Sequence, residues 1–561
     1  MGLKNLLANG RNLLSRRQSN IFSAALILAI AFGLSALLGI LRDRLLYARF
    51  YACCASDLDA YNAAFRLPDL VFQLLVIGAL SAAFIPIFSQ KLLEDESEAF
   101  LIARSLGTFL FLAFIPLALI IFIFAPFLSS LITAGFNYQQ LMVMADLTRI
   151  MIFAQAFFLF SNLTTGILQA HRRFIIPALS PLIYNLGIIL GVLLLSGWLG
   201  IYGPAIGVLF GAAGHFLIQY PLTRQLGFRL KPNFSFHFPE FKRILRLMLP
   251  RSLTLGLSQI ESTVILFFAT GFAAGSLSLL YLAEHLSQLF SRIFGATIGQ
   301  AALPSLSSLN ASQKSEEFNK VFMDSLLQSL YLSVWAAIVL LVLRIPLVRL
   351  AFGAKGFPWE ATLQTGRVLA ILSPAVIAQS GSQIVTRGYY SLQDTRRPLY
   401  ISLLSLAVTL LVSLFGIYVF GWGIAALVMA ISLAAIVRFG VLLFAISRKL
   451  SGFSWQRLGG FTLKILIISL ISAPVFWFLM RFGDMYFNTT RVWGLLLLTA
   501  LSLLGGSLSY LWLSFKLDVR EAKILLSLIK KMGHLPSIFQ LSQEQLEKPK
   551  ELISASLTKE L

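Results

Sequence analysis

Charged residues are scarce in this chain. Asp, Glu, Lys and Arg together make up 12% of its 561 residues, about half the share found in soluble globular proteins. Hydrophobic residues make up 58%, and the mean hydropathy is +0.82. This composition excludes an ordinary soluble domain and indicates an all-α protein that crosses the membrane many times.

Cysteine and catalytic motifs are also nearly absent. The only two cysteines are Cys53 and Cys54; adjacent cysteines rarely pair and two give no metal framework, so we expect packing residues. No Walker A sequence, G-x-S-x-G or H-E-x-x-H occurs, and the five histidines are scattered. The sequence therefore favours a protein that is not an enzyme and that holds no metal or cofactor.

The excess charge is positive. Lys and Arg number 45 against 24 Asp and Glu, a net charge of +21. In a membrane protein, basic residues gather in cytoplasmic loops, so we do not infer a nucleic-acid partner from this charge. Residues 1–20 are basic with scattered leucines, which predicts a segment lying at the membrane interface.

Fourteen apolar stretches are long enough to span a membrane. The first six would form one unit, residues 21–222, and the next six another, residues 247–446. The connector 223–246 separates them, and two further spans fall within 447–515. The predicted spans are 21–42, 64–89, 104–132, 146–170, 177–198, 201–222, 247–272, 276–305, 322–351, 366–391, 397–418, 420–446, 461–482 and 492–515.

Loop charges predict the orientation. Basic residues fall in the segment 1–20, in the connector, in the loops near 172, 396 and 448, and in the tail 516–561. The loops between them, such as 133–145, 199–200 and 273–275, carry almost none. Both termini are therefore expected on the cytoplasmic side.

The two halves resemble each other in three short stretches. "GALSAAFIPIFS" from Gly78 matches "GATIGQAALPSLS" from Gly295. "LITAGFN" from Leu131 matches "LAFGAKGF" from Leu350, and "GILQAHRRFIIP" from Gly166 matches "GYYSLQDTRRP" from Gly388. Three ordered matches at nearly one offset along the chain predict two six-helix bundles of the same orientation, with a substrate between them.

Ionisable residues interrupt the apolar pattern in both halves. The stretch "GILRDRLLYARFYACCASDLDAYNAAFRLPDL" begins at Gly39. It places Arg42 and Asp43 at the end of the first predicted helix, and Arg66 and Asp69 at the start of the second. Glu261 falls in the seventh helix, and Glu284, His285 and Arg292 fall in the eighth. Pro68, Pro86 and Pro304 are candidate hinges.

Two interpretations of these charges stay open. The residues could pair to lock helices together, for example Arg42 with Asp59 or Arg292 with Glu261. They could instead line a water-filled cationic cavity, since arginine suits a phosphate. A count does not decide, because five acids match five arginines: Asp43, Asp59, Asp69, Glu261 and Glu284 against Arg42, Arg44, Arg49, Arg66 and Arg292. The cavity would be cationic only with His285 protonated or some acids neutral.

These stretches, with "GQAALPSLS" and "RGYYSLQDTRRPLYIS", resemble the MurJ/MviN family of lipid II flippases, within the multidrug/oligosaccharidyl-lipid/polysaccharide exporter superfamily. The resemblance implies two six-helix lobes around a central cavity and two last helices that form a groove for a lipid tail. It implies a bacterial cytoplasmic (inner) membrane protein that binds an undecaprenyl-pyrophosphate-linked disaccharide-pentapeptide. Membrane lipids are further expected partners, as are cell-wall synthesis proteins.

The resemblance also assigns residues. Arg42, Asp43, Asp59 and a basic residue at Arg66 are kept, and Ser278 matches a serine of the cavity. The chain departs from the family at Ala36, Phe72, Gln73, Ile77 and Asp69, and it has His285 where the family has an arginine. We hypothesise that Arg292 acts with His285 to replace that charge, and that Glu261 orients Arg292.

The function expected on these grounds is transfer of lipid II to the outer leaflet by alternating access. Membrane potential, Na⁺ or H⁺ are each open as the driving force. A flippase for another polyprenyl-pyrophosphate-linked glycan would need the same phosphate site. A drug/cation antiporter would need a more acidic and aromatic cavity, and a scaffold for cell-wall enzymes would not need the charged cluster.

Overall fold

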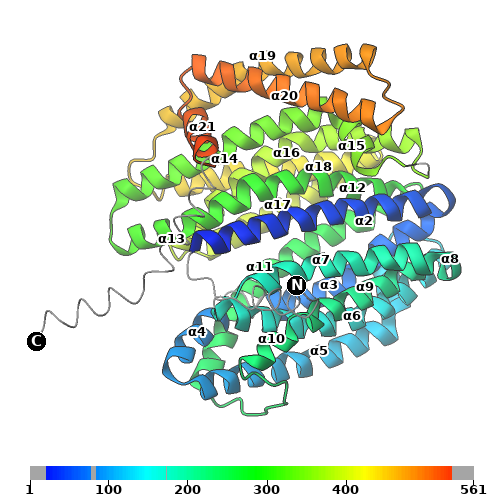
Figure 1. The fold of residues 1–561 in the computed structure, drawn as a ribbon, viewed down its shortest axis with the longest axis vertical. Coiled ribbons are helices and arrows are strands. Elements are labelled where there is room, and N and C mark those ends of the chain that lie inside the picture. Colours follow the sequence, from blue (N-terminus) through cyan, green and yellow to red (C-terminus); the bar gives the residue numbers. More distant parts are fainter. Residues whose placement is uncertain (1–20, 78–83, 172, 355, 533–561) are drawn as a thin grey trace, which may run out of the picture.

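Helices account for all regular structure in the part of the chain that is described. The computed structural model describes residues 21–77, 84–171, 173–354 and 356–532. Figure 1 shows the helices running roughly side by side, in two groups with a further pair at one edge. The predicted interfacial segment 1–20 lies outside the described residues.

Ten helices within the described ranges are long and apolar enough to cross a membrane. They confirm ten of the predicted spans, with ends that differ by several residues. Polar residues begin two of them: Asp95 accepts hydrogen bonds from the backbone N of Ser97 and Glu98, and Asn137 forms a capping box with Gln140. The ten are α5 (Glu96–Ile132), α6 (Tyr138–Ala170), α7, η3 and α8 (Ile175–Leu190, Gly191–Leu195, Ser196–Leu199), α9 and α10 (Tyr202–Leu217, Tyr220–Gln225), α14 (Ser315–Val342), α16 (Trp359–Ser391), α17 and η5 (Arg396–Leu414, Phe415–Val419), α18 (Ile424–Ser447), α19 (Trp455–Tyr486) and α20 (Val492–Lys516).

The other four predicted spans are not among the ten candidates found in the described residues. These helices carry the charged residues predicted for the site, and residues 78–83 of the second span lie outside the described part. They are α2 (Ile21–Ala64), α3 (Arg66–Phe72), η1 (Gln73–Ile77), α4 (Ile85–Glu94), α11 (Pro239–Ala269), α12 (Ser276–Ser291), η4 (Arg292–Ala296) and α13 (Thr297–Ala311).

Three predicted helix ends are wrong. Arg42 and Asp43 do not end a helix, because α2 continues to Ala64 with a kink at Cys54. The turns after Asp43 contain no Gly or Pro and bury Leu46 and Phe50, so nothing stops the helix there. The seventh helix begins at 239 instead of 247, and the span 322–351 breaks at residue 343 before α15 (Arg344–Phe352).

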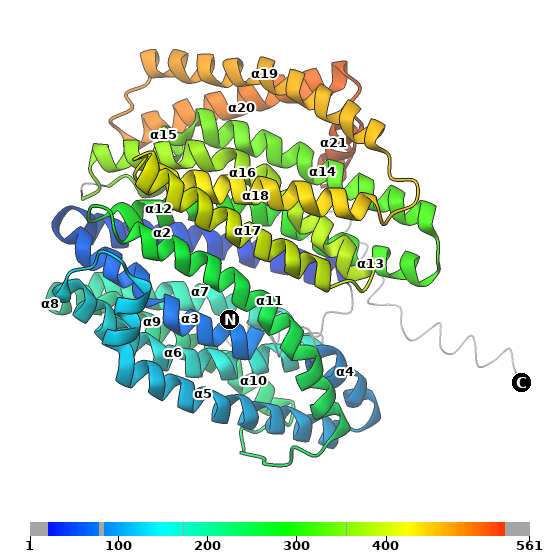
Figure 2. The ribbon, with the colours of Figure 1, turned by 180° about the vertical axis from the view of Figure 1, so that it is seen from behind.

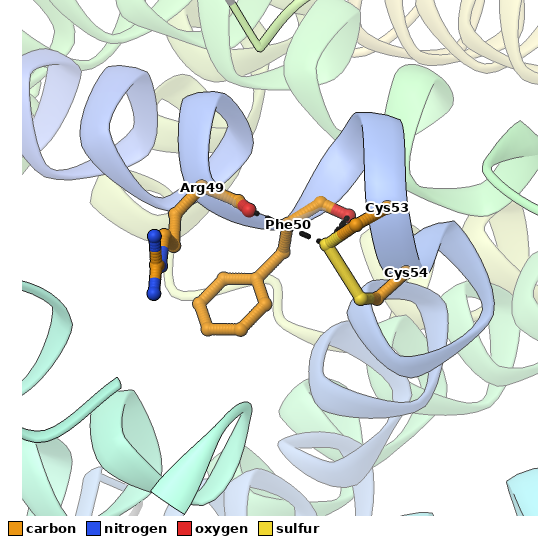
Figure 3. The surroundings of a disulfide bond; sticks show 4 residues. All are labelled: Arg49, Phe50, Cys53 and Cys54. Atoms are coloured by element: carbon orange, nitrogen blue, oxygen red, sulfur yellow. Dashed lines mark hydrogen bonds between the residues drawn. A yellow bond between two sulfur atoms is a disulfide. The ribbon is translucent and has the colours of Figure 1, made fainter. Parts of the chain in front are cut away.

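The expectation that the two cysteines stay unpaired is also wrong. Cys53 and Cys54 form a disulfide at the kink of α2 (Figure 3). The backbone of Cys54 is non-helical, with φ −147° and ψ 48°. The pair therefore lies at the tip of a helical hairpin, between the arm that carries Arg42 and the arm that carries Asp59.

The boundaries of the elements support the internal repeat. The starts of α5 and α14, Glu96 and Ser315, differ by 219 in the numbering. The starts of α6 and α16, and of α7 and α17, each differ by 221, and those of α9 and α18 differ by 222. The π-helical turns recur as well, because the starts of η1 and η4 differ by 219 and those of η3 and η5 differ by 224.

The helices from α2 to α10 form an N-terminal group, and those from α12 to α18 form a C-terminal group. The pair α19 and α20 packs against α14, and α21 (Arg520–Met532) contacts α14 and α20. Figure 1 shows α2 lying between α7 and α12, where the groups meet. Figure 2 shows α11 crossing from the N-terminal group towards α17, and it packs on α5, η1 and α17.

Candidate functional site

A chain of polar side chains joins the two groups at the middle of α2. Arg42 donates from Nε and NH2 to Asp43 Oδ1, at 2.9 and 2.7 Å, and from NH1 to Asn185 Oδ1 of α7 at 3.1 Å. His285 Nδ1, from α12, lies 3.2 Å from Asp43 Oδ2. The structure thus brings together Arg42, Asp43 and His285, three residues that the sequence predicted for one site. We call these three side chains the charged contact.

The carboxylate at its centre is the least accessible of the three. The side chain of Asp43 is 9% exposed, against 21% for Arg42 and 52% for His285. Because Asp43 neutralises Arg42, the pair presents little net charge to a ligand. Of the three side chains of the charged contact, His285 is the most accessible to a ligand.

Arg66 makes a second link between the groups. Its NH1 donates to Gln259 Oε1 of α11 at 3.1 Å, and its NH2 donates to the Tyr281 hydroxyl of α12 at 3.0 Å. Among the described residues no carboxylate forms an ion pair with it, and its buried Nε has no hydrogen-bond partner. Asp69, one turn further, accepts a 3.5 Å hydrogen bond from Gln155. Neutral partners therefore hold Arg66 by hydrogen bonds, and Asp69 and Glu284 lie near enough for an electrostatic interaction with it.

Glu261 does not pair with an arginine in the described structure. Its Oε1 accepts hydrogen bonds from Ser405 Oγ at 3.3 Å and from Thr409 Oγ1 at 3.0 Å, both on α17. The exposed Arg292 donates to Gln288 on its own helix at 3.2 Å. The alternative of an Arg292–Glu261 pair is therefore wrong, and so is the hypothesis that Glu261 orients Arg292. Glu284 lies near enough to Arg66, His285 and Glu261 for an electrostatic interaction with each.

Asp59 holds the start of a helix from the other group. Its Oδ2 accepts from the backbone N of Gly275 at 2.6 Å, and its Oδ1 accepts from Ser278 N at 2.9 Å and Ser278 Oγ at 2.5 Å. Gly275 precedes α12 with φ +90°, a conformation that favours glycine. The alternative of an Arg42–Asp59 pair is therefore wrong, because Asp59 caps α12 and Arg42 bonds to Asp43.

Close backbone contacts surround that cap. Tyr47 donates to the Ser278 carbonyl at 2.9 Å, and Asn62 donates to Ser278 Oγ at 2.9 Å. A Cβ on Gly135 would lie 2.6 Å from Gly271 Cα, and one on Gly356 would overlap the Ala48 carbonyl oxygen. These residues, with Asp59 and Gly275, form what we call the end contact. Sequence reasoning missed it, although Gly135 and Gly356 lie within or beside the repeated stretches.

The predicted hinge prolines occupy different positions. Pro68 lies in the first turn of α3, just after the turn at Phe65, and Pro86 is the second residue of α4. Proline fits the first turn of a helix without breaking it. Pro304 lies within α13, which continues through it. Their role as hinges stays a prediction.

Outside the spans, Asp394 is an acid held in its charged form. Asp394 lies in the loop between α16 and α17. Burial raises the pKa of Asp394, but hydrogen bonds from Lys449 Nζ and from the Arg397 backbone N outweigh burial and bring that pKa below its ordinary value. Lys449 Nζ lies 2.9 Å from Asp394 Oδ2. All three residues belong to the C-terminal group or its loops, so this ion pair does not join the two groups.

This arrangement is suited to binding and movement. In the described ranges no three His, Cys, Asp or Glu residues are grouped as metal ligands. The arginines and the histidine are hydrogen-bond donors for an anion, and each of the three bonds to a partner that a ligand could replace. The links between the groups include hydrogen bonds and an ion pair that can break singly, beside apolar packing of α2 on the C-terminal group.

A family model and individual relatives of this chain point to the same protein family. The model of the family "Lipid II flippase MurJ" matches residues 51–497. A probable lipid II flippase MurJ from Bdellovibrio bacteriovorus is 30% identical, over 78% of this chain and 84% of its own. The lipid II flippase MurJ from Burkholderia cenocepacia is 26% identical, over 70% and 77%.

Solved structures show the same fold. A lipid II flippase MurJ in an inward closed conformation superposes with a TM-score of 0.72 at 24% identity, covering 87% of this chain and 98% of that one. An inward-facing multidrug-resistance transporter of the MATE family gives a TM-score of 0.60 at 13% identity, covering 77% and 98%.

Proposed function

The chain belongs to the lipid II flippase MurJ family and is a membrane transporter, not an enzyme, and from this premise we propose how it moves lipid II. Lipid II is bound from the inner leaflet of the bacterial cytoplasmic membrane and released in the outer leaflet. The protein does this by alternating access, in which two bundles rock about a site between them.

The proposed architecture has fourteen spans. Residues 21–222 and 247–446 form two six-helix lobes, and 447–515 form a groove for the polyprenyl tail. The repeat of element starts at a nearly constant offset supports two equivalent lobes. These lobes are proposed to surround a hydrated cavity, which accounts for charges that would be costly in lipid.

Both termini are proposed to be cytoplasmic. The connector, the Arg396 and Arg448 loops and α21 are basic, and with this orientation they all face the cytoplasm. The end contact then lies on the periplasmic side. With Asp59 capping α12, the two groups are in contact on that side.

Arg66 is the observation that carries the proposal. Its guanidinium makes hydrogen bonds to neutral partners and has a buried Nε with no hydrogen-bond partner, which supports Arg66 as a donor to the pyrophosphate of lipid II. Two further hydrogen-bond donors for the phosphates are His285 and Arg42, which is held by Asp43 and Asn185. Ser278 and Asp59, which bond to each other, connect these donors to the end contact. The cargo is an undecaprenyl-pyrophosphate-linked disaccharide-pentapeptide, with membrane lipids around the tail.

Complementation tests this function. The wild-type gene should restore growth to a bacterium depleted of its lipid II flippase, and proteoliposomes should show lipid II moving between leaflets. Arg66→Gln should reduce transport at least tenfold, because a charge-assisted donor to the phosphates is lost. Arg224→Gln, an exposed residue of α10, is the matched control and should transport normally. Failure of the wild type to move lipid II would contradict the proposal.

A further inference from the structure

His285 reaches across the two groups to a carboxylate whose two oxygens have separate partners. Asp43 Oδ1 takes both hydrogen bonds from Arg42, at 2.9 and 2.7 Å. Its Oδ2 faces His285 Nδ1 at 3.2 Å. Arg42 therefore does not compete with the imidazole, and each can change state without breaking the other's bond.

This contact sets the tautomer of the imidazole. A carboxylate only accepts hydrogen bonds, so Nδ1 carries a proton whether the ring is neutral or charged. In the neutral ring Nε2 then has a lone pair and repels a phosphate oxygen. In the charged ring Nε2 is a donor. No group among the described residues bonds to Nε2, and the side chain is 52% exposed.

The charged groups around the ring determine how much this proton changes the local net charge. Facing it are Arg42 and Asp43 from α2, and Glu284 from its own helix, which in turn interacts with Arg66 of α3 and Glu261 of α11. Asp69 also interacts with Arg66, so two positive groups meet four carboxyl groups while the ring is neutral. The described residues of α14 and α16, which also pack on α12, give His285 no hydrogen bond or ion pair. One added proton reduces this excess of carboxyl groups and adds a donor.

We propose that lipid II binds with uptake of a proton by His285, so that the histidine ties pyrophosphate binding to pH. This rests on the proposed function. Asp43 would hold the ring while the Nε2–H donates to a phosphate oxygen, and release of the ligand would return the proton. Linkage then requires that affinity falls as pH rises, because the bound state holds one more proton than the free protein.

Binding of a short-chain lipid II analogue measures this directly. Its pyrophosphate is substituted on both sides, so it stays a dianion across the range used and does not itself cause a pH dependence. The dissociation constant should rise as the pH is raised, by up to about tenfold per pH unit for the one proton taken up. The probe is added to the purified full-length protein in lipid nanodiscs.

Three variants separate the proton from other effects. His285→Arg, which is always charged, should bind tightly with a flat pH profile, and His285→Gln should bind weakly with a flat profile. His237→Gln changes an exposed histidine of the connector and should keep the wild-type slope. A slope that persists in His285→Arg, or a wild type insensitive to pH, would overturn the inference while leaving the proposed function intact. Absence of binding in every form at every pH would contradict the proposed function as well.

Discussion

The two halves share one plan but carry opposite charges at equivalent places. Arg42 and Glu261 are separated along the chain by the same offset that separates the starts of η1 and η4. Arg42 bonds to Asn185 on α7, and Glu261 bonds to Ser405 and Thr409 on α17. Because α7 and α17 are repeat counterparts, the same pair of helices is linked in each half, with a base in the first and an acid in the second.

The contrast between Arg42 and Glu261 shows how a repeated fold can form an asymmetric binding site. The helices supply a frame with two equivalent positions, and the side chains decide which one attracts an anion. Asp59 and Ser278 are separated by that same offset, and here the two equivalent positions meet each other. Identical residues could not make this contact, because only one of them can be the carboxylate that caps the other's helix.

Removing the carboxylate at the meeting point should have the largest effect. Asp59→Ala leaves the Gly275 and Ser278 amides without their acceptor, which should destabilise the closed end contact by about 3 kcal/mol. Transport should be lost and the thermal unfolding temperature in detergent should fall. Complementation measures the loss of transport, and a melting curve measures the fall in unfolding temperature.

Two matched variants sharpen that test. Asp59→Asn keeps an acceptor without the charge and should fall between the wild type and the alanine variant. Asp57→Ala removes a carboxylate two residues away that caps no helix within the described structure, and it should behave as the wild type. Equal loss in Asp57→Ala and Asp59→Ala would mean that general charge, not the cap, matters.

The next effect is expected in the first half. Arg42→Gln leaves Asp43 with one cationic partner fewer, at a cost of about 2 kcal/mol, and weakens the donor set for phosphate. Arg42→Lys should recover part of the transport, since an ammonium can meet Asp43 but cannot also span to Asn185. The rate at which lipid II is flipped in proteoliposomes should be highest for the wild type, lower for Arg42→Lys and lowest for Arg42→Gln. A glutamine variant that transports fully would show that the first half does not use this charge.

The equivalent change in the second half should be milder. Glu261→Gln keeps an oxygen that accepts from Ser405 and Thr409, so we expect a loss of about 1 kcal/mol in stability. The affinity for a lipid II analogue should be unchanged or higher, because a negative charge is removed. Binding curves for Arg42→Gln and Glu261→Gln compare the halves directly. If both variants lost affinity equally, the assignment of the anion to the first half would be wrong.

Much of the frame followed from the sequence, because spans and repeats are patterns of hydrophobicity along the chain. Ten spans and the repeat offset needed only apolar length and short matches. The helix through Arg42 was placed wrongly, because a charged pair looked like a helix end although the residues after it continue the apolar face. The vicinal disulfide was also missed, since adjacency argues against pairing unless the backbone is kinked as at Cys54.

Partners within the site could not be read from the sequence. Arg42, Asp43 and His285 were predicted for one site, but the pairing of Asp59 with the α12 backbone depends on how two groups meet. Backbone amides carry no sequence signal of their own. Gln259 and Tyr281 were not predicted at all, because uncharged partners of Arg66 do not stand out from ordinary packing residues.

The smallest effect is expected at an ion pair that lies within one half and does not join the two. Lys449→Met removes the 2.9 Å partner of Asp394, an exposed type of pair for which about 0.5 kcal/mol is typical. Since the pKa of Asp394 is below its ordinary value in the folded protein, the pair stabilises the fold above about pH 4 and its contribution is lost as pH falls through the folded pKa. The melting temperatures of wild type and Lys449→Met should therefore differ slightly at pH 7 and converge below pH 4, and transport should be unchanged.

Arg448→Gln is the control for this prediction. Arg448 is the neighbouring cation and forms no ion pair in the described structure, so its substitution should cause no shift in melting temperature. A transport defect in Lys449→Met would mean that contacts inside one half also govern the movement, so that the contrast between joined and separate regions does not hold.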